Sequence, residues 1–128
     1  MKWIYSLAAA PALMATIAIF AVPSGAQGTP ASAQAFGMCA ACHTVAKGGR
    51  NGIGPNLSGL IGRRAGSVPG FSYSTAMKGS GLTWDAKTLD EFLAAPTKKV
   101  PGTKMPISVS DPAKRAAVIA YLTAATAK

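Results

Sequence analysis

The chain has 128 residues and a formal net charge of +9, with 13 Lys or Arg against 4 Asp or Glu. One small domain is expected at this length. The positive charges are dispersed among glycines and prolines instead of lining one helix, which argues against a nucleic-acid partner and for a protein partner with an acidic surface.

The N-terminal stretch of residues 3–22 contains no charged side chain. A lysine precedes it and small residues follow it at 24–26, a pattern typical of a cleaved secretory signal. We therefore expect a signal peptide at 1–26, a flexible N-terminal segment at 27–34 and one domain at 35–128, located in the periplasm. An uncleaved membrane anchor is the alternative, because about 20 apolar residues can span a bilayer.

The first element of the domain is expected to be a helix over residues 31–42. Ala35, Met38, Cys39 and Cys42 fall at i, i+3, i+4 and i+7, the spacing of one helical face. This helix would carry the two cysteines of the chain at its end.

Both cysteines and the one histidine of the chain fall together as Cys39-Ala40-Ala41-Cys42-His43, the spacing of c-type haem attachment. Two thiols three residues apart can add to the two vinyl groups along one edge of a porphyrin, and the next residue presents an imidazole to the iron. A structural zinc site needs four ligands, whereas this motif supplies three. A thioredoxin-like motif belongs after a β-strand, and none is expected before Cys39. A plain disulfide between Cys39 and Cys42 is the third alternative.

The middle of the chain is expected to form loops and short helices. Residues 45–69 are rich in glycine and show no strand alternation, so they are expected to wrap the cofactor. A brief helical turn is expected at 74–78. Apolar residues over 89–93 indicate a further short helix, which must end near Pro96.

The iron face opposite His43 requires a second ligand for an electron-transfer site, and methionine is the soft candidate because the chain has no second histidine. Met38 is next to an attachment cysteine and cannot reach round the ring. Met77 lies in a short helical run and is equally explained by packing. Met105 stands in a stiff, proline-rich loop, although a gap-filling role in the core is equally open on the residues alone.

The last helix is expected to begin at Asp111 and Pro112, a favourable N-cap and first-turn pair. Its apolar face repeats at helical spacing through Val118, Tyr121, Leu122 and Ala125. The expected fold class is therefore all-α, a small domain in which the first and last helices cross and loops surround a covalently bound haem.

Seven motifs follow one another along the domain: Cys39 to His43, Gly54-Pro55-Asn56-Leu57, Gly62-Arg63, Pro69-Gly70-Phe71-Ser72-Tyr73, Gly81-Leu82-Thr83-Trp84, Pro101-Gly102-Thr103-Lys104-Met105 and Ala120-Tyr121-Leu122. In the order and spacing of these motifs, nearly the whole domain resembles class I cytochrome c, the family of mitochondrial cytochrome c and its bacterial counterparts. The resemblance implies that Met105 is the distal ligand, that the Pro55 carbonyl accepts the second ring N–H of His43, and that Phe36 meets Tyr121 at the helix crossing. It further implies that the haem propionates are contacted by Arg63, Tyr73, Trp84 and Thr103.

This resemblance implies a haem protein that shuttles single electrons between respiratory or photosynthetic partners and catalyses no reaction of its own. The expected partners are acidic surfaces of a quinol–cytochrome c oxidoreductase, a terminal oxidase, a reaction centre or a dehydrogenase. The protein is expected to be a monomer that docks on these surfaces. Two alternatives are a dedicated haem subunit of a periplasmic dehydrogenase and a gas-binding or peroxidase-like haem protein. The lysines expected to steer docking are Lys47, Lys78, Lys98, Lys99 and Lys104.

Several positions depart from the family pattern. Ser32 replaces a glycine at the expected helix crossing, which should make the crossing slightly wider. Phe92 replaces a tyrosine whose hydroxyl bonds the ligand sulfur, so a somewhat different reduction potential is expected. Ile107 replaces an aromatic residue over the haem edge. Three docking lysines of the mitochondrial proteins are absent, at Met38, Gly52 and Thr97.

Overall fold

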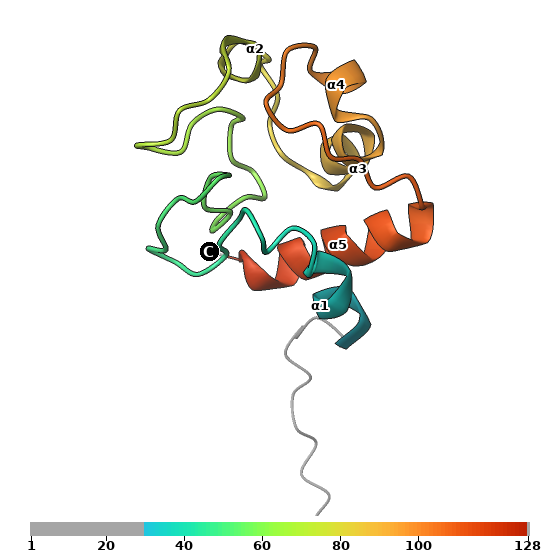
Figure 1. Cartoon of the computed structure of the whole chain (residues 1–128). Coiled ribbons are helices and arrows are strands. Elements are labelled where there is room, and N and C mark those ends of the chain that lie inside the picture. Colours follow the sequence, from blue (N-terminus) through green and yellow to red (C-terminus); the bar gives the residue numbers. More distant parts are fainter. Residues whose placement is uncertain (1–29, 128) are drawn as a thin grey trace, which may run out of the picture.

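A computed structural model describes residues 30–127 of the chain. Over this range no strand forms, and one isolated β-bridge joins Arg64 and Thr83. The all-α fold class is confirmed, with five helices in the order α1 (Pro30–Phe36), α2 (Thr75–Lys78), α3 (Ala86–Ala94), α4 (Pro96–Lys99) and α5 (Pro112–Ala125) (Figure 1).

The structure describes only part of the N-terminal region for which predictions were made. The predicted signal peptide at 1–26 lies outside the described residues. Helix α1 begins at Pro30, inside the segment 27–34 that was expected to be flexible and before the predicted domain boundary at 35. Among residues 30–127, no helix combines the length and the apolar character needed to cross a membrane.

Helices α1 and α5 cross and pack against each other, as expected (Figure 1). At the crossing the Phe36 and Tyr121 rings stack with centroids 4.6 Å apart and an interplanar angle of 26°. Val118 and Leu122 of α5 are buried, whereas Ala125, expected on the same face, is exposed. Thr126 is buried instead, because the helix ends at Ala125 and the Thr126 carbonyl accepts a hydrogen bond from Gly59 N at 2.9 Å.

Helix α1 ends at Phe36, so the prediction of one continuous helix to residue 42 is wrong. Gly37 follows directly, and glycine is a poor helix former. Hydrogen-bonded turns continue the chain: Cys39 N donates to Phe36 O at 2.8 Å and His43 N donates to Cys39 O at 3.0 Å. These turns keep both cysteines and His43 within one compact segment. Met38 is 51% exposed and does not share the buried face of α1.

Side-chain caps fix where α2, α3 and α5 begin. Ser74 accepts from Met77 N at 3.0 Å, and Asp85 accepts from Thr88 N at 2.7 Å. Asp111 accepts from Ala113 N at 2.8 Å, as its N-cap role predicts. Each cap satisfies a first-turn N–H that has no partner within its own helix.

The sequence does not predict helix α4, because Pro96 there indicates only the end of the preceding helix. Proline is also favoured at the first position of a helix, and Pro96 starts α4 in this way. Lys99 of α4 and Lys87 of α3 both pair with Glu91. The hydrogen bonds from Lys87 and then Lys99 lower the pKa of Glu91 to about 2. The Lys99 ammonium therefore forms an ion pair with a carboxylate of the same domain.

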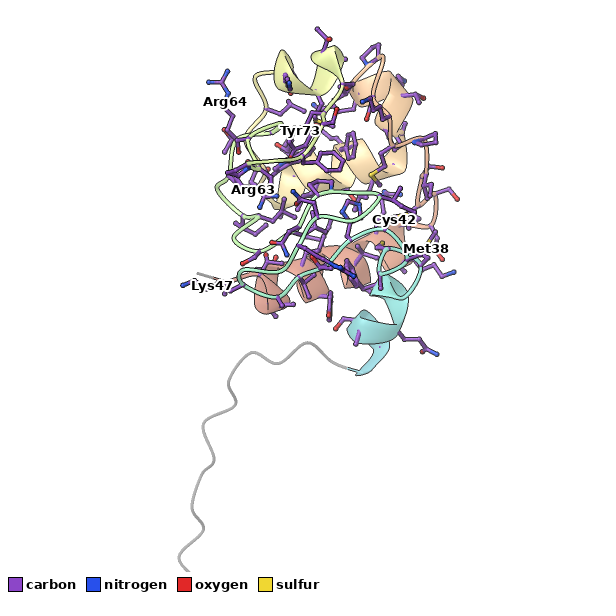
Figure 2. The ribbon with its side chains drawn as sticks, turned by 60° about the vertical axis from the view of Figure 1, so that its left-hand side comes forward. Met38, Cys42, Lys47, Arg63, Arg64 and Tyr73 are labelled. Atoms are coloured by element: carbon purple, nitrogen blue, oxygen red, sulfur yellow. The ribbon has the colours of Figure 1, made fainter. Side chains whose placement is uncertain are left out.

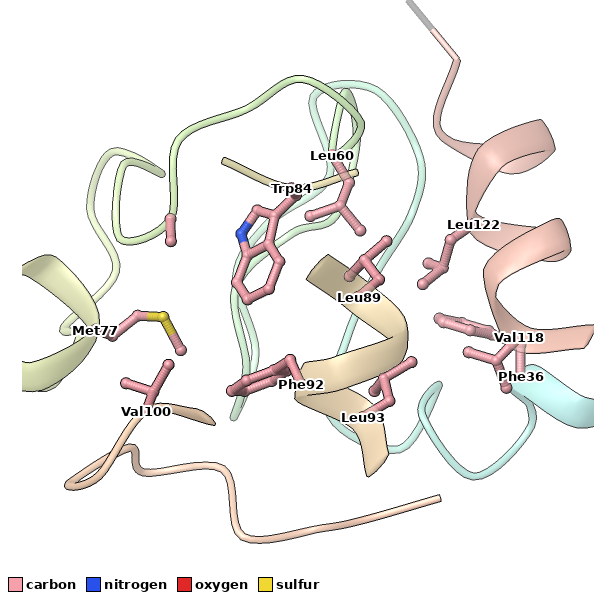
Figure 3. Close-up of a cluster of buried hydrophobic side chains, with 11 residues drawn as sticks. Phe36, Leu60, Met77, Trp84, Leu89, Phe92, Leu93, Val100, Val118 and Leu122 are labelled. Carbon is pink, nitrogen blue, oxygen red and sulfur yellow. The ribbon is translucent and has the colours of Figure 1, made fainter. Parts of the chain in front are cut away.

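Helix α3 lies between the helix crossing and the loops (Figure 3). On one side Leu89 and Leu93 approach Leu122 and the rest of the crossing, and on the other Phe92 packs edge-on against Trp84 with centroids 5.2 Å apart. The buried apolar side chains of this core are Phe36, Leu60, Ala65, Met77, Trp84, Leu89, Phe92, Leu93, Val100, Val118 and Leu122.

Replacement of Phe36 by alanine should lower the free energy of unfolding by about 3–5 kcal/mol, the usual cost of deleting a buried aromatic ring. Its ring is 4% exposed and stacks on Tyr121 at the helix crossing. Chemical denaturation of the complete holoprotein measures the change. The exposed Thr123→Ala substitution on α5 is the control and should change stability by no more than about 0.5 kcal/mol. An equal effect of the two substitutions would contradict the assigned crossing.

Candidate haem site

A cavity of about 250 Å³ lies at the centre of the domain, and every side chain predicted from the sequence to contact the haem or its iron lines it. Its wall is largely apolar and includes Phe36, Phe92 and Leu122 from α1, α3 and α5. The nine predicted residues on its lining are Cys39, Cys42, His43, Pro55, Arg63, Tyr73, Trp84, Thr103 and Met105.

The turn at residues 39–43 brings both cysteines and His43 to this cavity. The two thiols are half-buried and are not joined in a disulfide. Burial raises the pKa of the Cys39 thiol, and the nearby Cys42 thiol raises it further. The two sulfurs remain available for bonds to a partner outside the protein chain.

A single hydrogen bond sets the orientation of the His43 ring. Its Nδ1 lies 2.8 Å from the Pro55 carbonyl oxygen. Because a carbonyl oxygen can only accept, Nδ1 carries a proton, and in the neutral ring the lone pair is then on Nε2. Nε2 is therefore the nitrogen available to a metal.

Glycine at position 54 makes this arrangement possible. A Cβ on Gly54 would lie 2.3 Å from Cε1 and 2.7 Å from Nδ1 of His43. Both distances are far shorter than van der Waals contact, so the Cβ would overlap the ring. The backbone of Gly54 also donates to Cys42 O at 2.8 Å. The loop that supplies Pro55 is thereby held directly against the histidine ring.

Met105 reaches the cavity from the loop between α4 and α5. Thr103 Oγ1 accepts a hydrogen bond from Met105 N at 3.2 Å, which stabilises the local turn. Lys104 Nζ donates to Ser72 O at 3.2 Å and connects this loop to the one that carries Tyr73. Met77, 8% exposed, also lines the cavity and lies beside Val100 (Figure 3).

Arg63 and Tyr73 extend from the loops between α1 and α2 and line the same cavity (Figure 2). Arg63 Nη1 donates to Ser58 O at 2.7 Å, and its pKa is lowered by burial. The Tyr73 hydroxyl accepts from Val68 N at 3.2 Å, and burial raises its pKa. Backbone hydrogen bonds hold Arg63 beside Trp84, with Trp84 N donating to Arg63 O at 2.9 Å.

This set of groups fits a haem. Two unbridged thiols, an imidazole with Nε2 available and a thioether line one apolar cavity, and a guanidinium, a phenol and a threonine hydroxyl on the same lining can donate to carboxylates. The side chain at position 92 is phenylalanine, so it offers no donor to the Met105 sulfur.

The rim of the cavity is partly apolar. Met38, Ile53 and Ile107 line it and are 51%, 81% and 48% exposed. Lys104 is exposed and lines the same cavity, whereas Lys99 pairs with Glu91.

Some contributions to the site were not recognised from the sequence. The steric role of Gly54 was missed, although the segment containing it was noted. The side chains of Asn51 and Asn56 were not considered, and both hydrogen-bond within the loop that holds Pro55. Irregular loops have no periodicity that would reveal such contacts.

Residues 31–126 match the family model for cytochrome c. Cytochrome c2 of Rhodoblastus acidophilus is 50% identical over 93 residues, covering 72% of this chain and 87% of that protein. Cytochrome c of Cannabis sativa is 49% identical over 90 residues, covering 70% and 81%. The solved structure of cytochrome cH from Methylobacterium extorquens aligns with a TM-score of 0.67 at 49% identity, covering 73% of this chain and 94% of its own.

Substitution of Gly54 by alanine should displace the His43 ring and break its hydrogen bond to Pro55, because the new methyl group would overlap the ring. The His43 Nδ1–H resonance in NMR spectra of the holoprotein should disappear through exchange or shift strongly. Gly79→Ala is the control, since a Cβ there comes no closer than 3.3 Å to a neighbouring oxygen. An unchanged resonance in Gly54→Ala would show that the loop does not hold the ring as described.

Proposed function

The chain belongs to the cytochrome c family, and on this basis we propose that it holds the iron of one covalently attached haem c between His43 and Met105. It is an electron-transfer haem protein and not an enzyme. The thioether bonds would form at Cys39 and Cys42. The bound haem supplies a one-electron ferric/ferrous couple.

The observation that carries this proposal is the His43–Pro55 hydrogen bond at a cavity that Met105 also lines. The carbonyl holds the ring in one tautomer and raises the basicity of Nε2. A neutral imidazole and a neutral thioether in an apolar cavity favour the ferrous state and a high potential. With His43 and Met105 both bound to the iron, no position on the metal would be left for a substrate.

Arg63, Tyr73, Trp84 and Thr103 are the proposed donors to the haem propionates. Burial lowers the pKa of Arg63, but a guanidinium remains a cation at neutral pH and can pair with a carboxylate. Burial raises the pKa of Tyr73, so its phenol stays protonated and can donate a hydrogen bond. Partly buried carboxylates need such partners to offset their desolvation.

Met105→Ala should abolish the weak long-wavelength absorption band of methionine–iron ligation, lower the reduction potential and open the iron to carbon monoxide. The matched controls are Met77→Leu and Met38→Leu, which remove the other two thioethers at the cavity. Optical spectra of the oxidised and reduced holoproteins provide the readout. Rapid binding of carbon monoxide by the unmodified protein would instead support a gas-binding or peroxidase-like haem protein.

We further propose that the protein acts in the periplasm, as a monomer that exchanges electrons with acidic docking surfaces. The signal-like pattern of residues 3–22 supports export, and the net charge of +9 supports an acidic partner. The partner classes are a quinol–cytochrome c oxidoreductase, a terminal oxidase, a reaction centre or a dehydrogenase. Co-purification with one large dehydrogenase would favour the dedicated-subunit alternative.

Lys104→Glu should slow electron transfer to ferricyanide by roughly two- to fivefold at low ionic strength and accelerate the reaction with a cationic oxidant such as tris-phenanthroline cobalt. Lys104 is exposed and lines the cavity, so its charge should act on reagents that approach there. Lys114→Glu on α5 makes the same change in net charge and is the control. Stopped-flow rates over a salt series measure both. Equal effects of the two substitutions would contradict steering at the rim.

A further inference from the structure

The peptide bond between Pro55 and Asn56 is engaged on both of its polar edges. Its carbonyl oxygen lies 2.8 Å from His43 Nδ1, and its N–H donates to Asn51 Oδ1 at 2.9 Å. A chain of hydrogen bonds therefore runs from the Asn51 side-chain oxygen, through one peptide group, to the histidine ring.

Asn51 is itself held by a second contact. Its Nδ2 donates to Pro69 O at 3.2 Å, in the loop that leads to Tyr73. Immediately after it, Gly52 N donates to Gly54 O at 2.9 Å. One side chain thus accepts from the 55–56 peptide with its oxygen and holds the neighbouring loop with its nitrogen.

Hydrogen bonds in such a chain polarise one another. An acceptor on the peptide N–H moves electron density onto the carbonyl oxygen, which then accepts more strongly from the ring N–H. A stronger acceptor on Nδ1 makes Nε2 a better electron donor to a metal. We propose that Asn51 is a positioning residue for His43, which it orients and polarises through the Pro55–Asn56 peptide.

This inference rests on the proposed role of His43 as the iron ligand. Within that role it explains why an amide suits position 51. Aspartate would keep the acceptor to Asn56 N but lose the donor to Pro69, and alanine would lose both. The two arms of Asn51 can therefore be tested separately.

The experiment compares Asn51→Ala, Asn51→Asp and the control Thr44→Val in the complete holoprotein. Thr44 Oγ1 donates to Arg50 O at 2.8 Å and accepts from Asn56 Nδ2 at 2.7 Å. Its replacement by valine loosens the same loop without touching either polar group of the 55–56 peptide. The readouts are the exchange rate of the His43 Nδ1–H by NMR and the reduction potential.

Asn51→Ala should speed exchange of the ring N–H roughly tenfold, the change that loss of one hydrogen bond makes to an opening equilibrium, and should raise the potential. Asn51→Asp should restore slow exchange and lower the potential. Thr44→Val should leave both readouts near those of the unmodified protein. Equal changes in Asn51→Ala and Thr44→Val, or no change in Asn51→Ala, would overturn the inference. Absence of a haem-shifted ring N–H in the unmodified protein would overturn the ligand assignment itself.

Discussion

The 2.8 Å hydrogen bond between His43 Nδ1 and the Pro55 carbonyl is the interaction on which the rest of the site depends. It decides which ring nitrogen faces the cavity, and so which atom can bind a metal. It needs glycine at position 54, because any side chain there would occupy the space of the imidazole. It also joins the turn that carries the cysteines to a loop twelve residues further along the chain. The chemistry of the site and the path of the backbone are therefore fixed by the same contact.

The hydrophobic core and the cofactor cavity of this domain share their side chains. Phe36, Val118 and Leu122 lie at the helix crossing and also line the cavity. Phe92 of α3 and Trp84, against which it packs, belong to the same core and line the cavity as well. Four of the helices that the structure describes have nine residues or fewer, and long irregular segments connect them, so the protein alone offers a small core. A haem c in the cavity would complete that core and would couple the stability of the fold to the group that transfers the electron.

Features with a local physical cause could be predicted from the sequence. The Cys39 to His43 spacing matches the edge of a porphyrin, and Asp111 followed by Pro112 marks the start of α5 through capping. The first helix was extended too far because turns after Phe36 preserve an i, i+3, i+4 spacing without a helix. Other features depend on contacts that form only in the folded chain: helix α4, the ion pair of Lys99 with Glu91 and the contacts of Asn51. No periodic pattern in the sequence predicts them.

The central claim is a haem bonded through its vinyl groups to the sulfurs of Cys39 and Cys42. Intact-mass spectrometry of the denatured protein, purified from a host that matures c-type cytochromes, tests it most directly. The account predicts a polypeptide whose mass exceeds that of its chain by one haem, with no thiol left to alkylate. A mass equal to that of the polypeptide alone, with two reactive thiols after reduction, would contradict it.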